Sequence, residues 1–244
     1  MKFNKQIFTV LILATLVLLA ASASAQSIGA SSKQTSMFVF PNIMKSPEVP
    51  WNPNPIGPVI DRTAYVHPYA SIIGVVTIGP NVMVAPFASV RGDEGIPIFI
   101  GKDSNVQDGV VIHGLETVDE AGNPTNLYDV DGKKYAVYVG QRTSLAHQSQ
   151  VHGPAYVGND TFIGMQAFVF KAKIGNNCVL EPKSAAIGVN VSDGKYIPAG
   201  VFVTSQNQAD KLPNVYEGYA YQHTNEAVVH VNTNLAKGYN KAIH

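Results

Sequence analysis

The chain has 244 residues, of which 45% are hydrophobic, and its 17 lysines and arginines balance 17 aspartates and glutamates. This balance excludes the basic surface typical of nucleic-acid-binding proteins and the acidic surface typical of polycation-binding proteins, so we expect a small-molecule partner. Cys178 is the only cysteine in the sequence, which excludes an intrachain disulfide. Stability must therefore come from packing and assembly.

Residues 1–25 have the pattern of a secretory signal peptide. A short basic start precedes an apolar run from Ile7 to Ala20 and the small residues Ala23, Ser24 and Ala25, and this order predicts export and cleavage after Ala25. The apolar run is short for a membrane-spanning helix, although an uncleaved anchor is the alternative. We expect a periplasmic, cell-surface or extracellular protein with no membrane span after cleavage.

Residues 26–59 predict an extended lead to the folded domain. Residues 26–36 are rich in serine and glutamine, whereas residues 41–58 are rich in proline. The first composition favours flexible chain, and the second favours an extended arm.

Residues 60–206 carry a six-residue repeat that is interrupted twice. An aliphatic residue recurs at every sixth position, and the position two before it is nearly always small or β-branched. Residues two apart on a strand share a face, so each repeat predicts a short strand with one large and one small inward side chain. Three strands and their corners form one triangular coil. The aliphatic positions are Ile60, Val66, Ile72, Ile78, Val84, Val90, Ile100, Val106 and Ile112, then Val139, Leu145, Val151, Val157, Ile163, Val169, Ile174 and Leu180.

This pattern resembles that of the hexapeptide-repeat family. The resemblance implies an all-β fold, a left-handed parallel β-helix, and the handedness rests on the resemblance alone. Cys178 falls on a small inward position, so we interpret it as an inert core residue and not as a nucleophile.

Two insertions interrupt the repeat, one within residues 91–99 and one within residues 113–138. Insertions in solenoid proteins loop out and often carry function. The second predicts a mobile acidic loop, because it contains Glu116, Asp119, Glu120, Asp129 and Asp131.

The C-terminal segment, residues 207–244, predicts a helix packed alongside the coils. From Thr224, the expected N-cap, apolar residues recur at helical spacing. The residues expected to pack on the coils are Val228, Val231, Leu235 and Tyr239.

Counting repeats places three polar residues on one face of consecutive coils. Arg91, His113 and His152 each follow an inward aliphatic residue by one position, so they point outward and lie one above another. Neighbouring strands lie about 4.8 Å apart, a spacing at which two imidazoles can bind one metal ion. The register therefore predicts a metal site at His113 and His152.

His147 lies in the corner before this face. Five extended residues could separate it from His152 by up to about 16 Å, so we expect it to complete a neighbouring chain's site. Three such contacts would close a homotrimer under three-fold symmetry. Asn105 and Gln107 flank the inward Val106 on the preceding face, and should reach the metal from the His147 side.

Several stretches resemble the γ-class carbonic anhydrases, in order and over most of the chain. They are PWNPNP at 50–55, RGDEGIPIFIG at 91–101, SNVQDGVVIHGLE at 104–116, SLAHQSQVHGPA at 144–155 and FIGMQAFVFKAKIGNNCVLEP at 162–182. The resemblance implies a carbonate dehydratase, in which a metal-bound hydroxide reversibly hydrates CO2 to bicarbonate and a proton. It also implies that His113, His147 and His152 are the metal ligands, with His147 supplied by the neighbouring chain.

The resemblance assigns further roles. It implies that Glu94 and Glu116 transfer protons, that Gln107 hydrogen-bonds the metal-bound solvent, and that Asn105 orients the Gln107 amide. The positions implied around the substrate pocket are Trp51, Phe170 and Asn232. Those implied in a subunit-interface ion network, which we interpret as assembly and not chemistry, are Arg91, Asp93 and Asp108.

Two other functional classes stay open at this point. An acyltransferase of the same fold would need one histidine base and acyl-CoA, and a metal-binding trimer without catalysis would need no proton-transfer pair. We expect one divalent metal ion per site, with Zn²⁺ as the default for three histidines. Fe²⁺ and Co²⁺ also bind imidazole, so ligand type alone does not choose between them.

Overall fold

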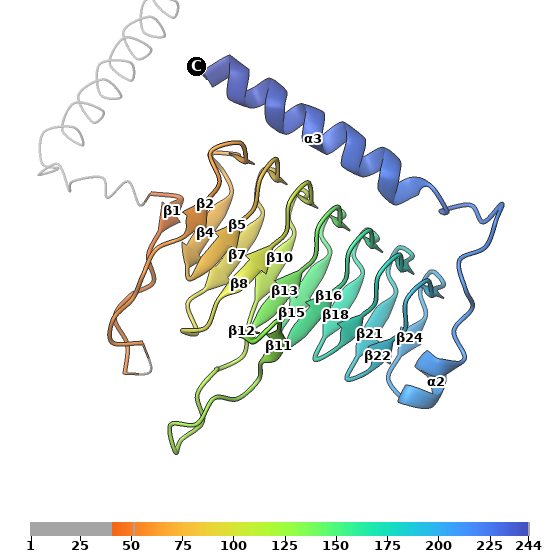
Figure 1. Ribbon diagram of the computed structural model, residues 1–244, viewed down its shortest axis with the longest axis horizontal. Coiled ribbons are helices and arrows are strands. Elements are labelled where there is room, and N and C mark those ends of the chain that lie inside the picture. The colour runs from red at the N-terminus through yellow and green to blue at the C-terminus, as the bar shows by residue number, and fades with distance from the viewer. Residues whose placement is uncertain (1–40, 51, 244) are drawn as a thin grey trace, which may run out of the picture. The chain divides into compact units, whose positions relative to one another are not determined.

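The computed structural model describes residues 41–50 and 52–243, and its core is a left-handed parallel β-helix whose coils stack along one axis (Figure 1). Each coil contributes one strand to each of three parallel sheets. The predicted fold class, a β-helix with a C-terminal α-helix packed alongside it, is confirmed. The signal segment 1–25, residues 26–40 of the lead and Trp51 lie outside the described residues.

We name each side of the coil after one of its strands. The β10 sheet comprises β1 (Ile43–Met44), β4 (Ser71–Gly74), β7 (Ser89–Gly92), β10 (Val111–His113), β15 (Gln150–His152), β18 (Phe168–Phe170), β21 (Ala185–Ile187) and β24 (Phe202–Val203). The β8 sheet comprises β2 (Val59–Ile60), β5 (Val76–Ile78), β8 (Ile98–Ile100), β13 (Val137–Val139), β16 (Ala155–Val157), β19 (Lys173–Ile174) and β22 (Asn190–Val191). The β9 sheet comprises β3 (Tyr65–Val66), β6 (Met83–Val84), β9 (Asn105–Val106), β14 (Ser144–Leu145), β17 (Phe162–Ile163), β20 (Val179–Leu180) and β23 (Tyr196–Ile197).

The aliphatic repeat forms the core of the coils, as the sequence predicts. The inward residues of all three sheets form one continuous cluster, which includes Cys178; in the first coil Ile60 and Val66 are partly buried and pack against it. Some small inward positions are polar, and their hydroxyls donate to carbonyls of the next coil. Ser104 Oγ donates to Gly140 O at 2.8 Å, and Thr143 Oγ1 donates to Gly158 O at 2.7 Å. These buried hydroxyls keep a hydrogen-bond partner, so serine and threonine are tolerated in this core.

The corner between the β9 and β10 sheets has the same left-handed backbone in successive coils. The φ values lie between 59° and 70° at Phe87, Gly109, Gln148, Gln166, Lys183 and Gly200. Non-glycine residues adopt this conformation only where the surrounding structure fixes it. His147 directly precedes one of these residues, so a rigid corner sets its position.

The second insertion is not a loop throughout. It contains an antiparallel hairpin, β11 (Tyr128–Val130) and β12 (Lys133–Tyr135). The Tyr135 ring lies 5.3 Å from that of Tyr138, and the Tyr128 ring lies 6.3 Å from that of Tyr156, between centroids. Residues 128–135 thus form a hairpin within the expected acidic loop, and tyrosine contacts anchor this hairpin to the β8 sheet.

Two helices follow the coils, α2 (Gln206–Asp210) and α3 (Thr224–Ile243). The short α2 begins with a capping box formed by Ser205 and Gln208. In α3 the carbonyl of His223 accepts the first helical hydrogen bond, from Ala227 N at 3.1 Å. The expected N-cap at Thr224 was thus one residue late. None of the helices in the described part of the chain is long and apolar enough to cross a membrane.

Helix α3 packs on the β9 sheet, where it contacts β3, β6, β9 and β14. The predicted face is the one turned toward the coils, because the Tyr239 ring stacks on that of Tyr65 in β3, with 4.6 Å between centroids. Val228 is partly buried, whereas Val231, Leu235 and Tyr239 are still 42–53% exposed. Ala236, which the sequence did not single out, is fully buried. Asn225 Nδ2 donates to Arg142 O at 2.8 Å, and Asn240 Nδ2 donates to Thr63 O at 3.0 Å. Amide hydrogen bonds and one small residue therefore add to the contacts of the predicted apolar face.

Candidate metal and proton-transfer site

His113 and His152 end neighbouring strands of the β10 sheet. In the parallel pairing, His113 stands opposite His152 on one side and opposite Arg91 on the other. The two imidazole centroids are 5.3 Å apart, and the rings meet at 82°. The predicted stacking of these three residues is confirmed, because each follows a buried aliphatic residue and strand alternation turns it out of the core.

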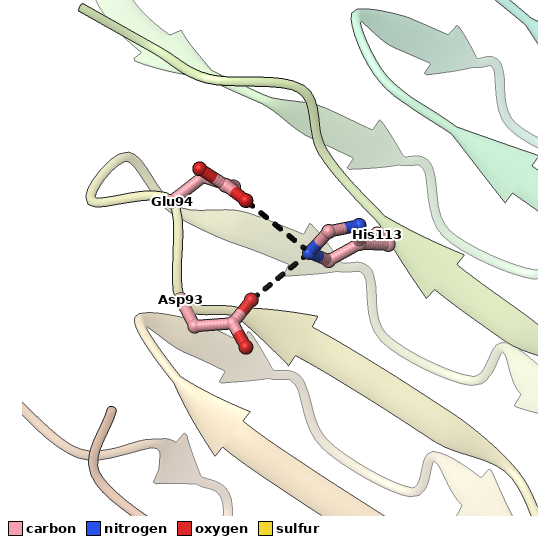
Figure 2. A group of neighbouring side chains, drawn as sticks. All are labelled: Asp93, Glu94 and His113. Carbon is pink, nitrogen blue, oxygen red and sulfur yellow. Dashed lines mark hydrogen bonds and ion pairs between the residues drawn. The ribbon is translucent and has the colours of Figure 1, made fainter. Parts of the chain in front are cut away.

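The first insertion brings two carboxylates to His113 (Figure 2). Nε2 of His113 lies 3.0 Å from Asp93 Oδ1 and 3.7 Å from Glu94 Oε1. Arg91 Nη2 lies 3.3 Å from the same His113 nitrogen. Burial by itself would raise the pKa of Asp93, but the hydrogen bond to His113 and the charge of Arg91 outweigh it and lower that pKa. Asp93 is therefore ionised beside His113, an environment that favours a cation.

His152 occupies a more apolar environment. Its ring centroid lies 5.5 Å from that of Phe170, which follows it in the next strand. Burial lowers the pKa of His152, and the neighbouring His113 and Arg91 lower it as well. A lowered pKa keeps the imidazole neutral, which is the form that binds metal ions.

His147 lies apart from this pair within one subunit. It sits in the rigid corner before β15, where its Nδ1 is 3.0 Å from Oδ2 of Asp108 in the adjacent coil. Among residues 41–50 and 52–243, the one group of three or more histidine, cysteine or acidic residues with converging donor atoms is Asp93, Glu94 and His113. A single subunit therefore does not bring the three histidines together.

A series of hydrogen bonds on the β9 sheet includes Gln107, which lines the same groove as His147. Gln107 Nε2 donates to Asn105 Oδ1 at 2.9 Å, and Asn105 Nδ2 donates to Ser144 Oγ at 2.9 Å. Asn105 and Ser144 are fully buried, and Gln107 is nearly so. The sequence did not single out Ser144, although the register offers the signal, since Ser144 stands opposite Asn105 in the neighbouring strand.

A groove of about 550 Å³ separates α3 from the β9 sheet beside His147. Its wall is largely apolar, with Met83 and Leu235 among the lining residues, and its polar groups include Gln107, His147 and Asn232. Of the residues expected around the substrate pocket, Asn232 lies here. Phe170 lies instead on the β10 sheet against His152, and Trp51 is outside the described residues.

The two expected proton-transfer residues lie on different insertions. The Glu94 carboxylate faces His113, as described above, whereas Glu116 is exposed. The carbonyl of Glu116 accepts a hydrogen bond from Asn126 Nδ2 at 2.8 Å within its own insertion.

The residues expected in an interface ion network lie against the histidines. Arg91 Nη1 is 3.4 Å from Asp93 Oδ2, and both residues approach His113. Asp108 approaches His147. These charged groups therefore border the candidate ligands within one subunit.

Comparison with known proteins identifies a relative that covers 98% of the chain. The chain is 64% identical to the carbonic anhydrase of Methanosarcina thermophila over 244 residues, which cover 98% of each protein. It is 46% identical to the carboxysome assembly protein CcmM of a Nostoc species, over 70% of this chain but 29% of that protein. No family model matches the chain.

The solved structures support the fold. The structure of a hexapeptide transferase family protein from Anaplasma phagocytophilum is similar with a TM-score of 0.57 and 23% identity. The match covers 75% of this chain and 93% of that protein. At this identity the likeness extends to the β-helix and not to an activity.

Proposed function

We propose that this chain, which belongs to the γ-class carbonic anhydrases, reversibly hydrates CO2 to bicarbonate and a proton at a metal site completed between subunits. The observation that carries the proposal is 64% identity to a carbonic anhydrase over 98% of both proteins. The juxtaposition of His113 and His152 on adjacent strands supports it.

The donor groups fit a divalent metal ion. His113 and His152 offer two imidazoles on adjacent strands, and burial favours the neutral form of His152. His147, supplied by a second subunit, would be the third ligand. Imidazole suits Zn²⁺ as well as Fe²⁺ and Co²⁺, with Zn²⁺ the first choice. When bound, the ion supplies the Lewis acidity that makes hydroxide available near neutral pH, its known role in carbonic anhydrases.

The position of His147 supports a homotrimer. His147 Nδ1 lies 3.0 Å from Asp108, and the three histidines do not converge within the described part of one chain, so a second chain would bring them together. The β10 sheet also carries exposed apolar residues, including Val111 at 37% and Phe202 at 60%. A surface of this kind is suited to a second copy of the chain, and three-fold symmetry would repeat the contact without open ends.

Gln107 would orient the reacting solvent molecule. Its Nε2 is engaged by Asn105, whose amide is fixed in turn by Ser144. The Gln107 amide oxygen is then the group left to accept a hydrogen bond from water at the site. The apolar wall of the groove beside His147 suits CO2, which carries no charge.

Glu94 and Glu116 would carry the proton to the solvent. Glu94 lies against His113, and Glu116 is exposed on the second insertion. One carboxylate near the site and one at the surface would offer a route by which each turnover could lose its proton. This pair also separates the proposal from a metal-binding trimer without catalysis.

The test is CO2 hydration by the full-length protein, purified without oxygen and loaded separately with Zn²⁺, Fe²⁺ or Co²⁺. We expect stoichiometric metal and rapid hydration in stopped-flow assays. Bound metal without hydration would favour a binding protein, and a metal-free protein that transfers acyl groups from acyl-CoA would favour an acyltransferase.

We also propose that residues 1–25 direct export. The basic, apolar and small-residue segments of the sequence support this. N-terminal sequencing of the protein from its native cells should find Gln26 first, and an intact Met1 in a membrane fraction would indicate an anchor.

A further inference from the structure

One buried hydroxyl joins the two insertions that carry the expected proton-transfer residues. Thr117 is 1% exposed, although its neighbour Glu116 is exposed to solvent. Its Oγ1 donates to the carbonyl of Glu94, 23 residues earlier in the sequence. This hydrogen bond connects the backbone of Glu94 directly to the residue that follows Glu116.

Thr117 is itself held within the second insertion. Thr125 N donates to Thr117 O at 3.0 Å, and an isolated antiparallel bridge pairs Val118 with Pro124. The Glu116 carbonyl is held by Asn126 from the same segment. The base of the insertion is therefore closed on itself, and Thr117 is its hydrogen-bonded contact with the Glu94 backbone.

The ligand strands do not depend on this contact. His113 lies on β10, whose pairing with β7 and β15 fixes its backbone. Glu94 lies beyond β7, in a turn between β7 and β8 that is outside the ladder. Loss of the Thr117 hydroxyl should therefore shift Glu94 relative to Glu116 and leave the imidazole pair in place.

We propose that Thr117 is a positioning residue for proton transfer, acting through its hydrogen bond to the Glu94 carbonyl. This inference rests on the proposed function, because it assumes that Glu94 and Glu116 carry the proton. Removing a proton-transfer group costs about a hundredfold or more in rate. Displacing a proton-transfer group through a loop movement should lower the rate by a smaller factor.

The test compares Thr117→Val, which keeps the shape but removes the hydroxyl, with Thr117→Ser, which keeps the hydroxyl. In Thr117→Val we expect kcat in weak buffer to fall about tenfold, while kcat/KM and metal content stay within about twofold of wild type. Concentrated imidazole should restore kcat, because an external buffer replaces the internal route. Thr117→Ser should retain most of the wild-type kcat.

A double variant tests whether Thr117 acts through Glu94. In a Glu94→Ala background, Thr117→Val should lower kcat in weak buffer little further. If the two residues acted independently, the free-energy effects of the two substitutions on kcat would add. Parallel losses of kcat and kcat/KM without buffer rescue, or full additivity, would overturn the inference. Thr117→Ala replaces Thr117→Val if the latter does not fold. Absence of CO2 hydration in the wild-type protein would instead overturn the proposed function.

Discussion

The β9 and β10 sheets have the same backbone architecture but very different outer surfaces. On the β9 sheet, outward residues such as Tyr65, Met83 and Phe162 are buried, because α3 and the segment around Tyr219 cover them. The β10 sheet carries His113 and His152 together with partly exposed apolar residues. The chain thus covers one side with its own C-terminus, and we propose that a second copy covers the other.

The largest expected effect concerns the histidines themselves. His147→Ala and His113→Ala should each fold but lose metal, because each site would lack one ligand. If the variants exchange subunits at equal concentration, about a quarter of the sites combine an intact His113 with an intact His147 from the neighbour. Metal content and activity should recover accordingly.

Gln148→Ala, in the same corner, is the matched control for His147→Ala. Comparing the two variants separates the loss of a metal ligand from damage to the corner. No recovery under proven subunit exchange would contradict the shared site.

A charge on the β10 sheet should weaken assembly without unfolding the coils. Val111 is 37% exposed in one subunit, and Val111→Glu would place an unpaired carboxylate in the proposed interface at a cost of about 2–5 kcal/mol. Sedimentation should find a shift from trimer to monomer. Thr77→Glu, on the β8 sheet, is the control and should remain trimeric; equal behaviour of both variants would count against the β10 sheet as the interface.

A larger side chain at the contact between α3 and the β9 sheet tests how closely the helix covers that sheet. Ala236 is fully buried, and Ala236→Leu should lower the free energy of unfolding by about 1–3 kcal/mol through overpacking. Denaturant unfolding measures this. Ala242→Leu, at an exposed position of the same helix, should change stability little. A neutral result at Ala236 would mean that α3 does not cover the β9 sheet closely.

The smallest effect is expected for chemical modification of Cys178, inside the coils. Burial raises the pKa of the Cys178 thiol to about 11, so at pH 8 it holds about a hundredfold less thiolate than an ordinary thiol. Iodoacetamide should therefore label the native protein very slowly, with the rate rising as pH approaches 11, and should label the denatured protein readily. Fast native labelling would contradict the inward position.

The sequence by itself determined the coil, its register and the stacking of His113 on His152. In a solenoid with a fixed repeat, the number of repeats between two residues gives their relative positions. Counting repeats therefore predicted that Val90, Ile112 and Val151 lie on neighbouring strands, as the strand pairing shows. The same count placed Cys178 in the core.

Only the tertiary structure decided what packs on the coils and between the insertions. The docking of α3 includes amide hydrogen bonds from Asn225 and Asn240, which a search for apolar periodicity does not detect. The Thr117 contact with Glu94 joins two segments outside the repeat, where counting gives no positions. Periodic backbone pairing can be inferred from spacing alone, whereas contacts made by irregular segments depend on how the whole chain folds.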